Sequence, residues 1–568
     1  MQLIKSIIYS FLFFLSINLY SQSPDLILLN GNIFTSDDTH PSCQAIAILK
    51  DKILAVGTND EISRLKGTNT NEIDLKGKFV MPGLIEGHGH MFGLGKSLST
   101  LNLLHTTSWE EILKMVQLQK SGFGVNEWIE GRGWHQEKWT SKPPITYQGY
   151  PTNKELSKLT PDNPVVLHHA SGHALIANEK VLSLANITAS TPDPEGGRII
   201  RDDKGNPTGV LEENAMNLID LAFKKSNVVQ PDDTIFSWWK KTINIAQESC
   251  LSNGITGFHD AGVSVQFIKY YTRLADEHGL KIRMWVMIND SLNKIMAFQN
   301  RLPILGYGQQ MLTVKSIKQY MDGALGSHGA WLLEPYTDKP GFVGQNVTPI
   351  AELEKMADFS FKHNLQLCIH AIGDKGNHEV LNLYEKIMSR DKSRQDLRWR
   401  IEHAQHVSVE DFDRFKNLGV IASMQAIHCT SDAPFVEKRL GKIRAQFESY
   451  AWRTLIDKGV HLANGTDTPV ENLNPFECIY AAVSRKRLDN GLSFYTEQKM
   501  TRIEALKSYT FWNAYAGFEE DIKGSISIGK LADIIILDTD LLNCNEENIA
   551  SAKVLTTICN GKVVYQIH

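Results

Sequence analysis

The stretch from Leu84 to Gly95, with the sequence LIEGHGHMFGLG, decides how the rest of the chain is interpreted. His88 and His90 are two residues apart, so on an extended strand both imidazoles point to the same side. A run of strand length precedes them and holds the apolar residues Phe79, Val80, Met81, Leu84 and Ile85. Two imidazoles at the end of a buried strand make half of a zinc site. A hydrogen-bonded polar pair at a strand end is the alternative.

Length and composition describe an ordinary soluble globular protein. The chain has 568 residues, a net charge of −5, 42% hydrophobic residues and 22% charged residues. This near-neutral charge provides no basic surface for nucleic acid, so we expect no nucleic-acid partner. The seven cysteines lack paired spacing, which argues against a disulfide framework and fits a large enzyme with its own core.

The first 21 residues have the pattern of a secretory signal peptide. Lys5 precedes an apolar run from Ile7 to Leu19, and Ser21 provides a small residue before the cleavage point. The run is short for a membrane span, and no second run is long enough to cross a bilayer. We therefore expect an exported protein, periplasmic or secreted, with no stable membrane span.

Short strand patterns separated by turns occupy both ends of the chain. They cover residues 26–29, 45–49, 53–56 and 72–75 at one end, and 533–537, 554–559 and 563–565 at the other. Each set alone is too small for a good core. We therefore expect residues 25–82 plus 520–568 to form one β-sandwich domain, and two separate small domains are the alternative.

Strands alternate with helices in the middle of the chain. After the strand before His88, strand patterns cover residues 254–259, 282–288, 312–322, 365–370, 398–403, 419–425 and 459–464. The pattern predicts an α/β fold, a parallel TIM (β/α)8 barrel over residues 83–519. Residues 97–230 far exceed a normal crossover, so we predict an inserted subdomain after barrel strand 1, lying over the barrel mouth.

Candidate metal ligands follow several of these strands. In a TIM barrel, catalytic groups come from the C-terminal ends of the strands. The candidates at those positions are His88, His90, Lys318, His370, His403 and Asp467. One such histidine alone is usually structural, but a set of them at separate strand ends of one barrel indicates a metal site. Neutral imidazoles together with a carboxylate suit Zn²⁺.

The motifs around these residues resemble those of the amidohydrolase superfamily. They are GHGH at 87–90, IKQYMDGALGS at 317–327, CIHAIGD at 368–374, RIEHAQH at 400–406 and NGTDTPV at 464–470. GRGWHQEKW at 131–139 is similar to the amidohydrolase 3 branch, which includes the N-substituted formamide deformylases. The resemblance covers nearly the whole mature chain, and it is specific for the superfamily but not for a substrate.

The resemblance implies a role for each candidate ligand. His88 and His90 would bind one Zn²⁺ together with Asp467, and His370 and His403 would bind a second. Lys318, carboxylated on its amine, would bridge the two ions. Lys315 and Lys318 are three apart and face opposite sides of a strand, so only one of them can point inward. An ordinary Lys318–Asp322 ion pair is the alternative.

The implied reaction is hydrolysis of a non-peptide carbon–nitrogen bond in an amide or N-substituted formamide by metal-activated water. Asp467 would carry the proton to the leaving nitrogen, with a turn or helix-capping aspartate as the alternative. By resemblance alone, His173 would contact the carbonyl, unless it is a surface histidine. His259, His428 and Trp134 would line the substrate pocket, although core packing is more usual for tryptophan. Asp374 would orient a ligand histidine.

Two other functions stay open at this point. The first is a mononuclear deaminase or other hydrolase on the same barrel, which would not need the lysine bridge. The second is an exported binding or regulatory protein without turnover, although every expected ligand is present. In either enzyme the partner is a small-molecule substrate. A homodimer is not excluded by anything in the sequence.

Overall fold

The computed structural model describes residues 23–219, 232–391, 393 and 396–567. The signal peptide predicted for residues 1–21 lies outside them. The chain divides into two compact units. The first combines the N-terminal part up to Ile85, Leu251–Thr256 and the part from Arg502 onward, and the second comprises Glu86–Cys250 and Gly257–Thr501. Among the described residues, no helix combines the length and apolar character that a membrane crossing requires.

A parallel sheet forms the nearly closed barrel that the alternating pattern predicts. Its strands, in spatial order, run β24-β23-β22-β21-β20-β18-β17-β8. Their bounds are β8 Leu84–Gly89, β17 Ile255–Val263, β18 Arg283–Ile288, β20 Leu312–Tyr320, β21 Gln366–Ala371, β22 Arg400–His403, β23 Ile421–Met424 and β24 Leu462–Asn464. Because neighbouring strands of this sheet run parallel, their carboxyl ends meet at one rim. The predicted fold class is confirmed.

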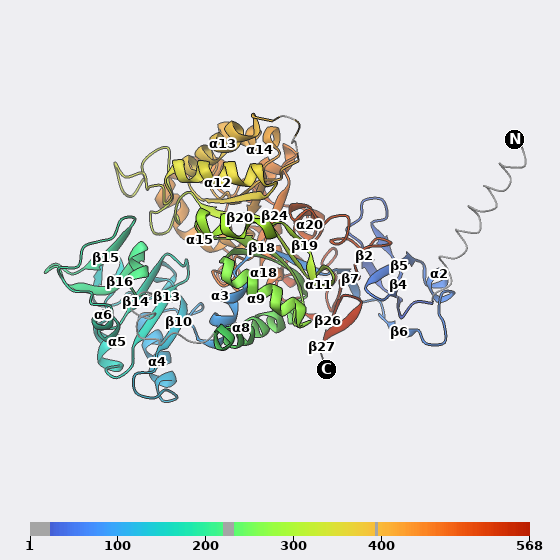
Figure 1. Ribbon diagram of the computed structural model, residues 1–568, viewed down its shortest axis with the longest axis horizontal. Coiled ribbons are helices and arrows are strands. Elements are labelled where there is room, and N and C mark those ends of the chain that lie inside the picture. Colours follow the sequence, from blue (N-terminus) through green and yellow to red (C-terminus); the bar gives the residue numbers. More distant parts are fainter. Residues whose placement is uncertain (1–22, 220–231, 392, 394–395, 568) are drawn as a thin grey trace, which may run out of the picture. The chain divides into compact units, whose positions relative to one another are not determined.

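Helices follow the barrel strands and surround them (Figure 1). They include α8 Asp232–Ser252, α9 Val265–Asp276, α10 Leu292–Phe298, α12 Ile350–Lys362, α13 Asp374–Met388, α14 Phe412–Leu418, α17 Trp452–Asp457 and α18 Pro475–Ser484. α9 begins after Ser264, whose hydroxyl accepts a hydrogen bond from the Phe267 amide. Four of its buried residues, Ile268, Tyr271, Leu274 and Ala275, recur at helical spacing and form the face toward the sheet.

The apolar run before His88 forms two strands, where the sequence suggested one. β7 (Phe79–Pro82) pairs with β2 (Asn32–Phe34) and with β25 (Ile534–Leu537) in a different sheet. Only after Gly83 does the chain enter β8, the first barrel strand. The chain therefore changes sheets within the run, and His88 lies inside the barrel strand instead of after it.

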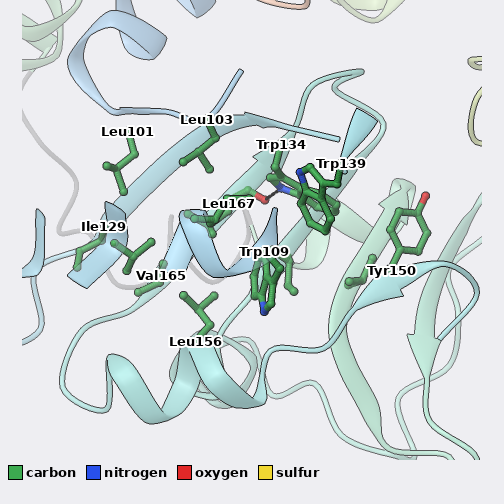
Figure 2. Packing of buried hydrophobic residues seen from close by; sticks show 14 of the residues in the cluster. Leu101, Leu103, Trp109, Ile129, Trp134, Trp139, Tyr150, Leu156, Val165 and Leu167 are labelled. Carbon is green, nitrogen blue, oxygen red and sulfur yellow. Dashed lines mark hydrogen bonds between the residues drawn. The ribbon is translucent and has the colours of Figure 1, made fainter. Parts of the chain in front are cut away.

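The inserted subdomain is built on its own six-stranded sheet, ordered β15-β16-β14-β13-β10-β9. The bounds are β9 Leu101–Asn102, β10 Ile129–Trp134, β13 Val165–His169, β14 Ala174–Ala177, β15 Gly197–Arg201 and β16 Pro207–Glu213. Figure 2 shows Trp109, Trp134 and Trp139 packed together against this sheet, with Leu156 and Leu167 beside them. The Trp134 indole donates to the Leu167 carbonyl at 2.8 Å, so its polar atom is satisfied inside the core.

Strands from both ends of the chain share one hydrophobic core in the other unit. One sheet is ordered β5-β4-β1-β6 and the other β27-β26-β25-β7-β2-β3. The additional bounds are β1 Leu26–Leu29, β3 Ser42–Cys43, β4 Ala45–Leu49, β5 Lys52–Gly57, β6 Asn71–Asp74, β26 Val554–Cys559 and β27 Lys562–Gln566. Leu28 and Ile46 from the first sheet pack in one cluster with Ile534 and Ile558 from the second. The two sheets are thus held together by apolar burial as a sandwich.

Candidate metal centre

One cavity, of about 820 Å³, collects most of the residues that the sequence singled out. His88, His90, Lys318, His370, His403 and Asp467 all line it, together with His173 and His428. Barrel strands β8, β20, β21 and β22 supply His88, Lys318, His370 and His403. His90 follows β8 directly, at the start of α3 (Met91–Ser99), and the loop after β24 supplies Asp467. The register aligns Tyr320 with His370 and Ala371 with His403, which brings these strand ends level.

A buried carboxylate binds His88 at Nδ1. Its Nδ1 donates to Glu402, and Glu402 is in turn bound by Arg400, with 2.7 Å between Arg400 Nε and Glu402 Oε1. Arg400 also donates to the Gly87 carbonyl at 2.8 Å. The Arg400 and His88 neighbours outweigh burial and hold the pKa of Glu402 below its usual range, so Glu402 accepts and Nδ1 carries the proton. The lone pair of His88 is therefore on Nε2.

A similar contact fixes His403. Its Nδ1 lies 2.7 Å from Oε1 of Gln425, and the Gln425 amide nitrogen donates to the Ser423 carbonyl at 3.1 Å. That second bond sets the direction of the amide, so the oxygen faces the ring and Nδ1 is the donor. His403 then offers Nε2 to the cavity as a lone pair.

Asp467 lies opposite these imidazoles. Its Oδ1 is 3.1 Å from Nε2 of His90 and 3.5 Å from Nε2 of His88. The loop that carries it is bonded to β8, because the Asp467 amide donates to the His88 carbonyl at 2.8 Å. Ligand atoms of His88, His403 and Asp467 all lie within 4.8 Å of one another, a separation that one cation can fill.

Burial favours the neutral form of the His88, His370 and His403 rings, and the neighbouring histidines favour the charged form of Asp467. Burial lowers the pKa of His88 to about 4, and it holds the pKa values of His370 and His403 well below the ordinary range. The pKa of Asp467 is also held low because the neighbouring histidines outweigh its burial. Among the described residues, Nε2 of His88 and of His370 have no hydrogen-bond partner. Neutral imidazole and ionised carboxylate are the forms that bind Zn²⁺-like ions.

Lys318 extends from β20 into the same cavity and is buried, with an exposed fraction of 1%. Burial lowers the pKa of its ammonium group. The Asp322 carboxylate instead accepts the backbone amides of Trp331, Ile372 and Gly373 at 2.8 to 2.9 Å. No Lys318–Asp322 ion pair occurs among the described residues, so the ordinary ion pair is not what the structure contains.

His370 and His173 continue the row of rings along the cavity. The ring centroids of His370 and His403 are 4.5 Å apart, and those of His370 and His173 are 6.1 Å apart. His173 comes from the loop between β13 and β14 of the insertion, and its Nδ1 lies 2.9 Å from Glu213. Although burial opposes it, Glu213 raises the pKa of His173. The insertion therefore adds to the cavity a histidine whose pKa is raised, whereas the pKa values of His88, His370 and His403 are lowered.

Three residues differ from the sequence-based interpretation. Trp134 is fully buried in the core of the insertion, and His259 lies under the barrel rim with Nδ1 3.1 Å from Arg400, so neither lines the cavity among the described residues. Asp374 begins α13 and accepts the Leu333 and Lys375 amides, which makes it a helix-start residue and not a partner of a ligand histidine. His428 lines the cavity as expected, with its ring 6.1 Å from that of His403.

Sequence reasoning missed the residues that support the ligands. Glu402 and Arg400 lie two apart on β22, so they share one side of a strand that is otherwise buried. A buried Arg-x-Glu pair immediately before a candidate ligand was the available signal. Gln425 and Glu213 carried no comparable signal, because each reaches its histidine only through the tertiary fold.

The fold and this cluster of ligands define a metal-dependent hydrolase of the amidohydrolase type, and comparison with known proteins agrees. The model of the Amidohydrolase family matches residues 71–565, so the chain belongs to this family.

Individual relatives cover almost the whole chain. Protein LONG AFTER FAR-RED 3 of Arabidopsis thaliana is 33% identical over 95% of this chain and 91% of its own length. N-substituted formamide deformylase of Arthrobacter pascens is 26% identical, covering 96% of this chain and 99% of its own. Among solved structures, an uncharacterized metal-dependent hydrolase from Pyrococcus horikoshii OT3 is 28% identical with a TM-score of 0.74, covering 92% of this chain and 99% of its own.

Proposed function

We propose that the protein hydrolyses an amide-type carbon–nitrogen bond of a small molecule, in the manner of an N-substituted formamide deformylase. The observation that carries this proposal is the convergence of His88, His403 and Asp467 within 4.8 Å in a cavity large enough for a small substrate. Family membership and the similarity to the Arthrobacter pascens deformylase support the same reaction class.

The residues present fit a zinc ion. The hydrogen bonds at Nδ1 of His88 and His403 leave the Nε2 lone pair of each ring free to bind a metal. The Asp467 carboxylate lies 3.5 Å from Nε2 of His88 and 4.0 Å from Nδ1 of His403, and imidazole with carboxylate is the donor set that suits Zn²⁺. A zinc ion bound there would lower the pKa of a coordinated water to about 7 and polarise a carbonyl group. His90, 3.1 Å from Asp467, completes the set on the side of β8.

Side chains of the protein would handle the protons. Asp467, ionised and beside the ligand histidines, takes the proton of the attacking water and delivers it to the leaving nitrogen. His173, held by Glu213 with its second nitrogen toward the cavity, donates a hydrogen bond to the carbonyl oxygen as charge develops there.

The number of metal ions at the site, one or two, distinguishes two versions of this function. The compact set of three ligands favours a one-ion site, as in a mononuclear deaminase. The buried Lys318 and the Nε2 of His370, which has no hydrogen-bond partner among the described residues, support a second ion. Burial lowers the pKa of the Lys318 ammonium group, which favours the amine form that reacts with CO₂, and the resulting carbamate would offer one oxygen to each ion. We therefore favour two Zn²⁺ ions bridged by carboxylated Lys318.

Export completes the proposal. Lys5, the apolar run to Leu19 and the small residue Ser21 support removal of a signal peptide and a periplasmic or secreted mature protein. Mass spectrometry of the N-terminus tests this point. An intact Met1 on protein from the cytoplasmic fraction would contradict it.

The decisive experiment assays zinc-loaded protein on N-substituted formamides, other amides, hydantoins, esters and aminopurines, with metal content measured in parallel. We expect release of amine from formamides or other amides, and a fall in kcat of about 100-fold or more for Asp467→Asn, which loses the proton carrier. Ammonia released from aminopurines would instead favour the deaminase. Full metal content without turnover of any compound would favour a binding or regulatory protein.

A further inference from the structure

Arg132 is a cation of the cavity wall that forms no ion pair with a carboxylate among the described residues. It lies on β10 of the insertion, and its guanidinium makes two hydrogen bonds, both to carbonyl oxygens. Nε donates to Pro469 at 3.4 Å and Nη2 donates to Ala170 at 3.1 Å. A guanidinium has five N–H donors. Among the described residues, Nη1 has no hydrogen-bond partner, so its N–H donors stay available to a ligand in the cavity.

The other charged groups of this wall are matched. Lys96 lies 2.7 Å from Glu130 and Lys138 lies 3.4 Å from Glu471, while Glu213 is bound to His173. Arg132 thus differs from these three pairs and, like Lys318, forms no ion pair in the described part of the cavity. Burial lowers its pKa to about 10, which still leaves the guanidinium charged at neutral pH. The Asp467 carboxylate acts on the half-buried guanidinium through its charge, but among the described residues no carboxylate forms an ion pair with it, so its remaining N–H donors can bind an anionic ligand.

The position of Arg132 connects it to the reacting centre. Pro469, whose carbonyl it binds, is two residues after Asp467 on the same loop. On the opposite side, Gly172 borders the guanidinium, since a Cβ atom there would come within 3.7 Å of Nη2. The two carbonyl bonds fix the plane of the guanidinium, which is the preorganisation that bidentate binding of a carboxylate needs.

We propose that Arg132 binds a carboxylate group of the substrate, so that the preferred substrate carries a carboxylate near its amide-type bond, as an N-acyl amino acid does. This inference rests on the proposed hydrolase function and specifies its substrate class. One planar guanidinium matches one carboxylate through two parallel hydrogen bonds. The metal centre of the barrel would then break the amide-type bond, and Arg132 of the insertion would select the substrates that carry a carboxylate near it.

The test compares an N-formyl amino acid with its carboxamide, which differ in the negative charge of the carboxylate that Arg132 would bind. We expect the wild-type protein to favour the carboxylate in kcat/KM by about tenfold or more. Arg132→Gln should reduce that ratio to near one, mainly by raising KM for the carboxylate, and Arg132→Lys should give an intermediate ratio. Metal content should be retained in both variants.

Arg201→Gln is the matched control. Arg201 also lies on a strand of the insertion and bonds to backbone carbonyls, those of Thr188, Ala189 and Gly205, but it does not line the cavity. It should keep the wild-type preference. An equal preference for the two compounds in the wild type, or an unchanged ratio in Arg132→Gln, would overturn the proposal.

Binding separates this inference from the proposed reaction. Calorimetry of the zinc-loaded protein with an amino acid and with its carboxamide, neither of which holds the N-formyl bond, needs no turnover of that bond. Tighter binding of the carboxylate that is lost in Arg132→Gln supports the anion site even if no compound is hydrolysed, in which case only the proposed function fails. Equal binding of the two ligands, with hydrolysis of amides intact, contradicts the anion site alone.

Discussion

His88 donates from Nδ1 to Glu402, and the opposite nitrogen of the same ring, Nε2, lies 3.5 Å from Asp467. One hydrogen bond therefore sets both the tautomer and the direction of a candidate ligand. Arg400 binds Glu402 on its other side, so the contacts from Arg400 to Glu402 and from Glu402 to His88 together fix the direction of the ring.

Glu402→Gln should weaken metal binding without removing a ligand. The amide no longer provides an anionic acceptor, so His88 loses its fixed orientation, and metal affinity should fall about 10- to 100-fold. Competition with a chelator measures this affinity directly. Glu385→Gln, which removes an exposed carboxylate bound to Arg414, is the control and should behave as the wild type. Unchanged affinity in Glu402→Gln would contradict the supporting role.

His88→Ala and His90→Ala should each remove metal and activity together. Both imidazoles face Asp467, and the loss of either one leaves the site short of a ligand. Metal content and turnover are measured on the same preparation, with circular dichroism to verify folding. His40→Ala, an exposed histidine in the other unit, is the control. Stoichiometric metal with normal turnover in His90→Ala would show that the site is misassigned.

Lys318→Ala tests the number of ions. If carboxylated Lys318 bridges two ions, the variant should retain one metal or fewer per chain, and short carboxylic acids should restore part of the activity by supplying the missing oxygens. Lys315→Ala is the matched control three residues away on the same strand, because Lys315 does not line the cavity. One metal per wild-type chain, with Lys318→Ala near wild-type activity, would indicate a mononuclear enzyme.

Glu448 should make stability depend on pH. Burial, with Asp374 as a second cause, raises the pKa of this carboxyl to about 7 from a usual value of 4.5. The folded state then keeps a proton that the unfolded state releases, so stability is lost as pH rises from about 4.5 through 7. Glu448→Gln should be more stable than wild type at pH 8, by about 1 kcal/mol after screening of this half-buried group, and the difference should shrink toward pH 5. Denaturant unfolding at both pH values decides, and a constant difference would contradict the assignment.

The sequence predicted site residues best where the position of a residue in its strand determines its position in the fold. Strand-end residues such as His370 and His403 reach the cavity because a parallel barrel brings all its carboxyl ends to one rim, and this follows from alternation alone. The division of the first apolar run at Gly83 does not follow from hydrophobicity, since both halves are buried, each in a different sheet. Trp134 was equally ambiguous, because a large apolar ring suits a cavity wall and a core alike.

Supporting contacts were the least accessible part of the site. Gln425 and Glu213 meet His403 and His173 across strands whose register no short pattern reveals. Arg132 lay within a recognised motif, but its value as an anion site depends on which carboxylates its neighbours already bind. Pairing of that kind is a property of the assembled wall and cannot be derived from the residue types alone.

The wide separation of the ligand set along the chain has a consequence for when the metal is acquired. His88 and its carboxylate partner Glu402 are 314 residues apart, and Asp467 comes later still. An unfolded chain therefore offers a metal ion little more than the His88–His90 pair, which is too few ligands for tight binding. Most of the binding energy becomes available only when the first and last barrel strands meet, so loading with metal and closure of the barrel stabilise each other. Chelation should accordingly loosen the seam between β8 and β24 before any other part of the barrel.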